Sequence, residues 1–106
     1  MSRMLPQPKS DSIELTTVLA ALADPVRLEM MRALHRQAEP VNCSVLVRNT
    51  GIEVTPPTMS HHWKTLRAAG LTSTEVVGRE RIITIRAEEL EQRFPGLLRS
   101  VLDADT

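Results

Sequence analysis

The chain has 106 residues, of which 42% are apolar and 25% charged, and its formal net charge is zero. This length favours one small globular domain, which would bury about two thirds of the surface that its unfolded chain exposes. No apolar run approaches the roughly 18 residues needed to cross a membrane, and the N-terminus lacks the apolar core of a secretion signal. One cysteine excludes an intrachain disulfide and fits a reducing compartment, so we expect a cytoplasmic protein without membrane contact.

The chain is expected to begin with an unstructured arm followed by helices. Residues 1–9, with Pro6 and Pro8, predict a disordered arm, and residues 10–104 predict the folded domain. Apolar residues then recur with helical spacing at Ile13, Leu15, Val18, Leu19 and Leu22. This first helix is more apolar than one buried face requires, which indicates a second surface to be covered.

Two further helices are marked by their N-caps. Asp24 can cap a helix over residues 26–36, with Pro25 at the first helical position. Asn42 can cap a shorter helix over residues 43–49.

The helix over residues 56–69 is the most informative part of the chain. Gly51 ends the preceding helix, because glycine tolerates the left-handed conformation of a helix end. Thr55 can cap the start of the helix over residues 56–69. One sector of this helix is apolar and holds Met59, Trp63, Leu66 and Gly70. The opposite sector holds Pro57, Ser60, His61, Lys64 and Ala68, with Arg67 on one flank. This second sector has short donors and acceptors and no acid, which suits a helix entering the DNA major groove.

A β-hairpin is predicted directly after this helix. β-Branched residues dominate two runs within residues 72–86, and the turn between them is expected at residues 78–80. Arg79 lies at the tip and Arg81 on the flank. Two short helices separated by a glycine form a helix-turn-helix outline, and the hairpin is its wing. The fold class is therefore mainly α with a small β-hairpin wing: a winged helix-turn-helix, dimeric as argued below.

The zero net charge conceals a polarised distribution. Residues 59–86 carry five basic residues against two acidic ones, with Arg86 counted among the five, whereas residues 87–106 carry two against five. A basic helix and hairpin with an acidic tail favour DNA binding over a merely solvated charged face.

The C-terminal segment predicts a short turn over residues 88–93 and a final helix over residues 95–104, because Pro95 interrupts its apolar repeat. This helix and the apolar first helix need a surface to bury against. A second copy of the chain supplies one economically, and packing on the domain's own core is the alternative.

Two motifs resemble the ArsR/SmtB family of bacterial winged-helix repressors. They are Ala-Asp-Pro-Val-Arg-Leu at residues 23–28 and Ser-His-His-Trp-Lys at residues 60–64, and the similarity covers about residues 12–103. The resemblance implies a homodimer that is joined by the first and last helices and binds double-stranded DNA at an imperfect palindrome. It also implies repression of transcription until an inducer releases the DNA.

The resemblance places Ser60 and His61 where the family contacts bases and backbone, with Pro57 and Thr58 at the leading end of the helix. The basic residues would neutralise phosphates. The predicted DNA-binding residues are Pro57, Thr58, Ser60, His61, Lys64, Arg67, Arg79 and Arg81. His62 is instead expected to be a structural histidine inside the domain.

Neither metal site known in that family can be assembled from this chain. One uses at least two cysteines near the third helix, where Cys43 is the chain's single cysteine. The other uses histidine on the final helix, and no histidine follows His62. We expect no metal, no cofactor and no catalytic residues, and an inducer that the sequence does not identify.

Two alternatives stay open. Cys43 lies on an apolar helical face, which predicts a buried structural thiol, but a repressor that senses redox through Cys43 is the sharper hypothesis. Winged helices also serve as protein-interaction modules, and the zero net charge supports that interpretation.

Overall fold

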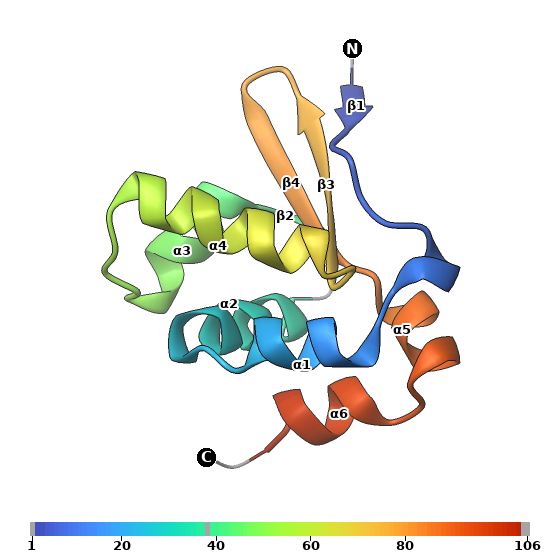
Figure 1. The fold of residues 1–106 in the computed structure, drawn as a ribbon. Coiled ribbons are helices and arrows are strands. Elements are labelled where there is room, and N and C mark those ends of the chain that lie inside the picture. The colour runs from blue at the N-terminus through green and yellow to red at the C-terminus, as the bar shows by residue number, and fades with distance from the viewer. Residues whose placement is uncertain (1, 38, 105–106) are drawn as a thin grey trace.

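The computed structural model describes residues 2–37 and 39–104. Within these ranges the chain forms a short 3-10 helix, six α-helices and a four-stranded sheet (Figure 1). The β3–β4 hairpin projects away from the helices, and α4 lies beside the base of the hairpin, above α1 and α2 in this view (Figure 1). The prediction of a mainly helical fold with a hairpin wing is confirmed. Met1 of the predicted arm and Asp105 of the acidic tail lie outside the described residues.

The second helix begins at its predicted cap. A 3-10 helix at Ser10–Ser12 precedes α1 at Leu15–Leu22, and α2 spans Pro25–His35. The Asp24 carboxylate accepts hydrogen bonds from the backbone N–H groups of Val26 at 2.9 Å and Arg27 at 3.0 Å. Asp24 is therefore the N-cap of α2, as predicted.

The helix-turn-helix consists of α3 at Cys43–Thr50 and α4 at Pro56–Ala68. The Asn42 side chain caps α3 by accepting from the N–H of Ser44 at 2.9 Å, and Gly51 follows with a left-handed φ of 75°. Both features agree with the sequence. Thr55 is the N-cap residue of α4, as predicted, but its side chain accepts no N–H of the helix and donates instead to the Thr58 hydroxyl at 2.9 Å.

Gly70 fixes the direction in which the chain leaves α4. Its φ is 90°, and the N–H of Leu71 donates back to the carbonyl of Leu66 at 3.1 Å, as in a Schellman motif. A Cβ at Gly70 would lie 2.6 Å from Cγ1 of Ile13. Glycine is required here both for backbone conformation and for space, and it sends the chain directly into the hairpin.

The hairpin pairs β3 at Thr72–Val77 with β4 at Glu80–Ile85. Val77 lies opposite Glu80, so the turn consists of two residues, one fewer than predicted. Gly78 is its first residue, with a φ of 62°, which matches the type II′ turn of tight hairpins. The short strand β2 at Val41–Asn42 pairs with β4, and the sheet order is β1-β3-β4-β2.

The prediction of a disordered arm was wrong for the residues that the structure describes. Ser2–Met4 forms strand β1, which pairs antiparallel with β3, and the N–H of Leu5 donates to the carbonyl of Thr74 at 2.9 Å. Without β1, this edge of β3 would leave its backbone groups unpaired, and Leu5 is buried beside it. The backbone of β3 stabilises residues 2–5, and nothing in the sequence of residues 2–5 indicates that they pair with β3.

The C-terminal boundaries also differ from the prediction. The expected turn is helix α5 at Ala87–Arg93, and the expected long final helix is the shorter α6 at Leu97–Leu102. Pro95 does separate the two, but Gly96 follows with a φ of 81° and delays the start of α6.

Aliphatic side chains and methionines build most of the core, as the low aromatic content requires. Its fully buried apolar residues are Ile13, Val18, Met30, Met31, Leu66, Leu71, Ile83 and Leu90. Two large residues of α1 remain outside it: Leu15 is 44% exposed and Leu19 is 43% exposed. Among the described residues, no helix is both long enough and apolar enough to span a bilayer.

Candidate nucleic-acid interface

The outer face of α4 presents the polar residues that the sequence assigned to DNA. Pro57, Thr58, Ser60, His61 and Lys64 are exposed, whereas Arg67 is half-buried. Within the described part of the chain, the side chains of Ser60, His61 and Lys64 make no hydrogen bond. Their donors and acceptors are therefore available to another molecule, and no acid lies among them.

The inner face of α4 sets this orientation. Trp63 and Leu66 are buried, and His62 is only 8% exposed. The Nδ1 atom of His62 lies 3.3 Å from Nη1 of Arg27, whose Nε donates to the carbonyl of Ala21 at 2.7 Å. His62 is therefore engaged within the domain, as expected, and its burial leaves His61 pointing outward.

Asp24 completes the support beneath α4. The N–H of Arg27 donates to its carboxylate, and this hydrogen bond, with the charge of the Arg27 guanidinium, holds the pKa of Asp24 below its ordinary value against the opposing effect of burial. Asp24 and Arg27 thus cap α2, bond to the end of α1 and contact His62, so hydrogen bonds connect α1, α2 and α4 beneath the helix-turn-helix.

The hairpin adds cations beside α4. Arg79 is exposed in the turn, and Arg81 is exposed on β4. Arg81 lines a cleft together with Ser60 and Arg67 of α4, so the predicted residues of helix and wing meet along one groove. Burial and, secondarily, repulsion from Arg81 lower the pKa of Arg67.

Strand β1 places a third cation next to this groove that the sequence did not predict. Arg3 lies opposite Val76, and Val76 lies opposite Arg81. Residues paired across a sheet share one face, so Arg3 and Arg81 flank Val76 on the same side. Arg3 was missed because the arm was expected to be disordered, and no local pattern would have identified it.

Arg86, which was counted in the basic segment, does not belong to this surface. Its side chain is 4% exposed, and its guanidinium donates to the two carboxylate oxygens of Glu89 at 3.1 and 2.5 Å and to the carbonyl of Pro8 at 2.7 Å. The hydrogen bonds from Arg86 to Glu89, with the Arg86 charge, lower the pKa of Glu89 against the opposing effect of burial. Arg86 therefore joins the start of α5 to the N-terminal segment and is closed to DNA.

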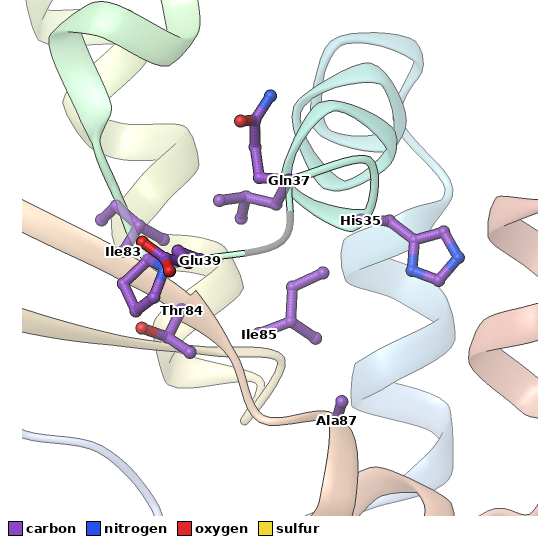
Figure 2. A pocket seen from close by; sticks show the side chains of 9 residues that line it. His35, Gln37, Glu39, Ile83, Thr84, Ile85 and Ala87 are labelled. Atoms are coloured by element: carbon purple, nitrogen blue, oxygen red, sulfur yellow. The ribbon is translucent and has the colours of Figure 1, made fainter.

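A separate cleft lies between the end of α2 and strand β4 (Figure 2). Its volume is about 250 Å³, and its described lining includes Glu39 and His35 but neither lysine nor arginine. None of the predicted DNA-binding residues lines it. This cleft has the wrong charge for a phosphate backbone and lies apart from the interface.

The thiol of Cys43 is half-buried and packs against the core next to α4. Among the described residues, no group of three His, Cys, Asp or Glu side chains converges in a way that could hold a metal ion. Whether Cys43 responds to oxidants stays a hypothesis.

Comparison with known proteins agrees with this arrangement. The helix-turn-helix domain family matches residues 22–75, from the end of α1 into β3. An uncharacterized HTH-type transcriptional regulator of Bacillus subtilis (strain 168), YceK, is 31% identical over 93 residues, which are 88% of this chain and 91% of that protein. Both findings point to regulation of transcription, a function class that is typically non-enzymatic. The chain belongs to the family of helix-turn-helix transcriptional regulators.

Proposed function

We propose that this regulator is a homodimeric repressor of the ArsR type, which reads an imperfect DNA palindrome with α4. The observation that carries the proposal is the outer face of α4, where Ser60, His61 and Lys64 are exposed, unengaged within the described chain and free of acidic neighbours. A helix exposed only to solvent does not require short polar side chains without acids. A helix inserted into the major groove does require them, because base edges present hydrogen-bond donors and acceptors at close range.

The residues divide into two groups by what they would contact. Thr58, Ser60 and His61 would face base edges, with Pro57 at the leading end of the helix. Lys64, Arg67, Arg79 and Arg81 would neutralise phosphates and supply the salt-sensitive part of the affinity. Arg3 extends that second group along the wing. This division predicts that the first group determines which sequence is bound and the second determines how tightly any duplex is held.

Dimerisation through α1 and α6 is what the family resemblance implies, and the apolar surface that the single chain leaves uncovered on α1 supports it. Val18, Ala21 and Leu22 of α1 are buried, whereas Leu15 and Leu19, one helical turn apart, are exposed on the sector next to them. Burying two leucines would contribute roughly 1.5–3 kcal/mol for each fully covered side chain. Two-fold symmetry would place two copies of α4 about 34 Å apart, one turn of DNA.

A repressor must also lose its DNA on a signal, and we propose an inducer that is not a transition metal. A thiolate metal site of this family uses at least two cysteines, and Cys43 is the chain's single cysteine. A regulator must be in the same compartment as the DNA that it binds, so we propose that this protein is cytoplasmic.

The experiment that tests the proposal is fluorescence anisotropy with the duplex upstream of the protein's own gene. A scrambled duplex of the same composition is the control, and both are measured at low and at physiological salt. The proposal predicts selective binding that weakens steeply with salt. No binding to either duplex at low salt would contradict it and would favour the protein-interaction module.

Sedimentation equilibrium of wild type and Leu19→Ser tests the dimer separately. Wild type should sediment as a dimer, and the variant should dissociate at concentrations where wild type does not. A monomeric wild type, or a variant that dimerises equally well, would contradict the assigned interface.

A further inference from the structure

We propose that the cleft between α4 and the wing is a binding site for a small free oxyanion, such as phosphate or a short carboxylate. The effect on DNA that we assign to this ion rests on the function proposed above, but the site itself does not. The cleft is lined by Cys43 of α3, by Ser60, Trp63 and Arg67 of α4, and by Thr74, Arg81 and Ile83 of the sheet.

Two cations meet at this cleft without a counter-ion. No ion pair joins Arg67 or Arg81 to a carboxylate within the described residues, and no acidic residue lines the cleft. The two guanidinium groups are close enough that Arg81, after burial, contributes to lowering the pKa of Arg67. An anion between them would replace this repulsion with two charge-assisted hydrogen bonds, for which the planar guanidinium is well suited.

Two buried donors of the same cleft also have no partner. Trp63 is 6% exposed and Thr74 is 1% exposed, and neither the indole N–H nor the threonine hydroxyl has a hydrogen-bond partner among the described residues. Buried polar groups are nearly always paired. The indole N–H and the Thr74 hydroxyl are closed to solvent, as is the unpaired hydroxyl of Thr72 outside the cleft, so a small movement of the cleft walls is needed before either can donate to a ligand. After such a movement, the oxygen atoms of a single small anion could accept from the arginine, indole and hydroxyl groups together.

The size of the cleft selects the class of ligand. Its volume is about 230 Å³, which is below the roughly 300–1,000 Å³ of sites for drug-sized molecules. It has room for an ion of phosphate size and a few waters, each of which occupies about 30 Å³. A duplex phosphate is tethered to its neighbours at the surface, whereas a free ion can enter the cleft that Arg67 and Arg81 line, so we assign the cleft to the free ion.

Occupancy would act on DNA binding directly. The ion would neutralise Arg67 and Arg81, which the proposed function gives to DNA phosphates. The chain would thus bind its operator more weakly when the ion is abundant, with no change of fold.

The first arm of the test measures the ion alone, on the full chain without DNA. The sequence contains one tryptophan and no tyrosine, so the intrinsic fluorescence reports on Trp63 in the cleft. Sodium phosphate is titrated against sodium chloride at equal ionic strength. Wild type should show a saturable change with phosphate, and Arg81→Gln should bind phosphate about tenfold more weakly, as expected for one lost charge-assisted hydrogen bond.

The matched control for this arm is Arg79→Gln, which removes the same charge from the hairpin turn outside the cleft and should retain the wild-type titration. Circular dichroism melting checks that each variant is folded. A linear response in wild type, or equal weakening in the two variants, would overturn the site.

The second arm adds the operator duplex and follows anisotropy with and without phosphate at constant ionic strength. Phosphate should weaken DNA binding by wild type, and Thr74→Val, which removes a buried hydroxyl and no charge, should be less sensitive. Equal sensitivity in Thr74→Val and wild type would overturn the coupling to DNA. If neither protein binds any duplex, the proposed function fails while the fluorescence titration still decides the site.

Discussion

The two ends of strand β4 carry the same residue type in opposite roles. Arg81, near the wing tip, is exposed, lines the groove beside α4 and has no carboxylate partner among the described residues. Arg86, directly after the strand, is buried and donates to both oxygens of Glu89 and to the carbonyl of Pro8. The guanidinium of Arg81 is available to a ligand, whereas that of Arg86 is already hydrogen-bonded within the domain.

The difference shows that a basic segment is not a basic surface. A charge on the chain contributes to binding only if the fold leaves its hydrogen-bond donors unsatisfied, since a fully paired arginine has little to offer a phosphate. Counting charges along the sequence therefore includes Arg86 in the candidate interface, although it is buried, and leaves out Arg3.

Replacing the buried arginine should affect stability and spare DNA contacts. We expect Arg86→Met to lower the free energy of unfolding by about 2 kcal/mol, less than the 3–5 kcal/mol for a fully buried pair because the Glu89 carboxylate can take up water. Urea denaturation measures this. Arg81→Met is the matched control and should change stability by less than about 0.5 kcal/mol. Equal losses in the two variants would break the comparison.

The adjacent histidines of α4 should divide in the same way. We expect His61→Ala to cost about 1–2 kcal/mol in operator binding and to relax sequence preference, with little change in melting temperature. His62→Ala should instead lower the melting temperature, because it removes the contact with Arg27. If His61→Ala leaves affinity and preference unchanged, the assigned orientation of α4 on DNA is wrong.

Replacing the exposed arginine should affect every DNA sequence alike. We expect Arg81→Met to weaken operator and scrambled duplexes by the same factor and to reduce the slope of log K against log salt by roughly 0.9, one phosphate contact. Anisotropy titrations at four salt concentrations measure the slope. Arg86→Met, measured where it is folded, should keep the wild-type slope, and a shallower slope in that variant would count against the distinction.

The pair at Arg86 should also give a small pH signature. Because the pKa of Glu89 is lowered from its ordinary value of 4.5, its contribution to stability is present above that value and is lost as pH falls through the lowered one. Glu89 is 39% exposed at its side chain, so we expect an effect of at most about 1 kcal/mol. Urea midpoints of wild type and Glu89→Gln should differ at pH 7 and converge in acid. A gap independent of pH would assign the effect to packing.

Local rules in the sequence predicted the parts of the fold that depend on neighbouring residues. The caps at Asp24 and Asn42, the stop at Gly51 and the two sectors of the helix 56–69 all follow from spacing and side-chain chemistry, and all are present. The errors lie where distant segments meet. Strand β1 requires the edge of β3, and Arg86 is buried by an acid three residues later and a carbonyl 78 residues earlier.

The candidate site shows the same limit. Helical periodicity was sufficient to place Ser60, His61 and Lys64 on an exposed face. It gave no indication that Arg67 and Arg81 would share a groove, nor that Trp63 and Thr74 would line it with unpaired donors. Both groupings depend on how the hairpin packs beside α4. Gly70, which lies between α4 and β3, determines the direction in which the chain enters the hairpin.

The most direct measurement of the central claim is the change in backbone amide chemical shifts when operator duplex is titrated into the labelled protein. We predict that the largest changes fall on residues 57–64 of α4 and on the turn around Arg79, with small changes in α5 and α6. Changes concentrated in α5 and α6, with α4 unaffected, would show that DNA binds elsewhere and would contradict the assigned interface.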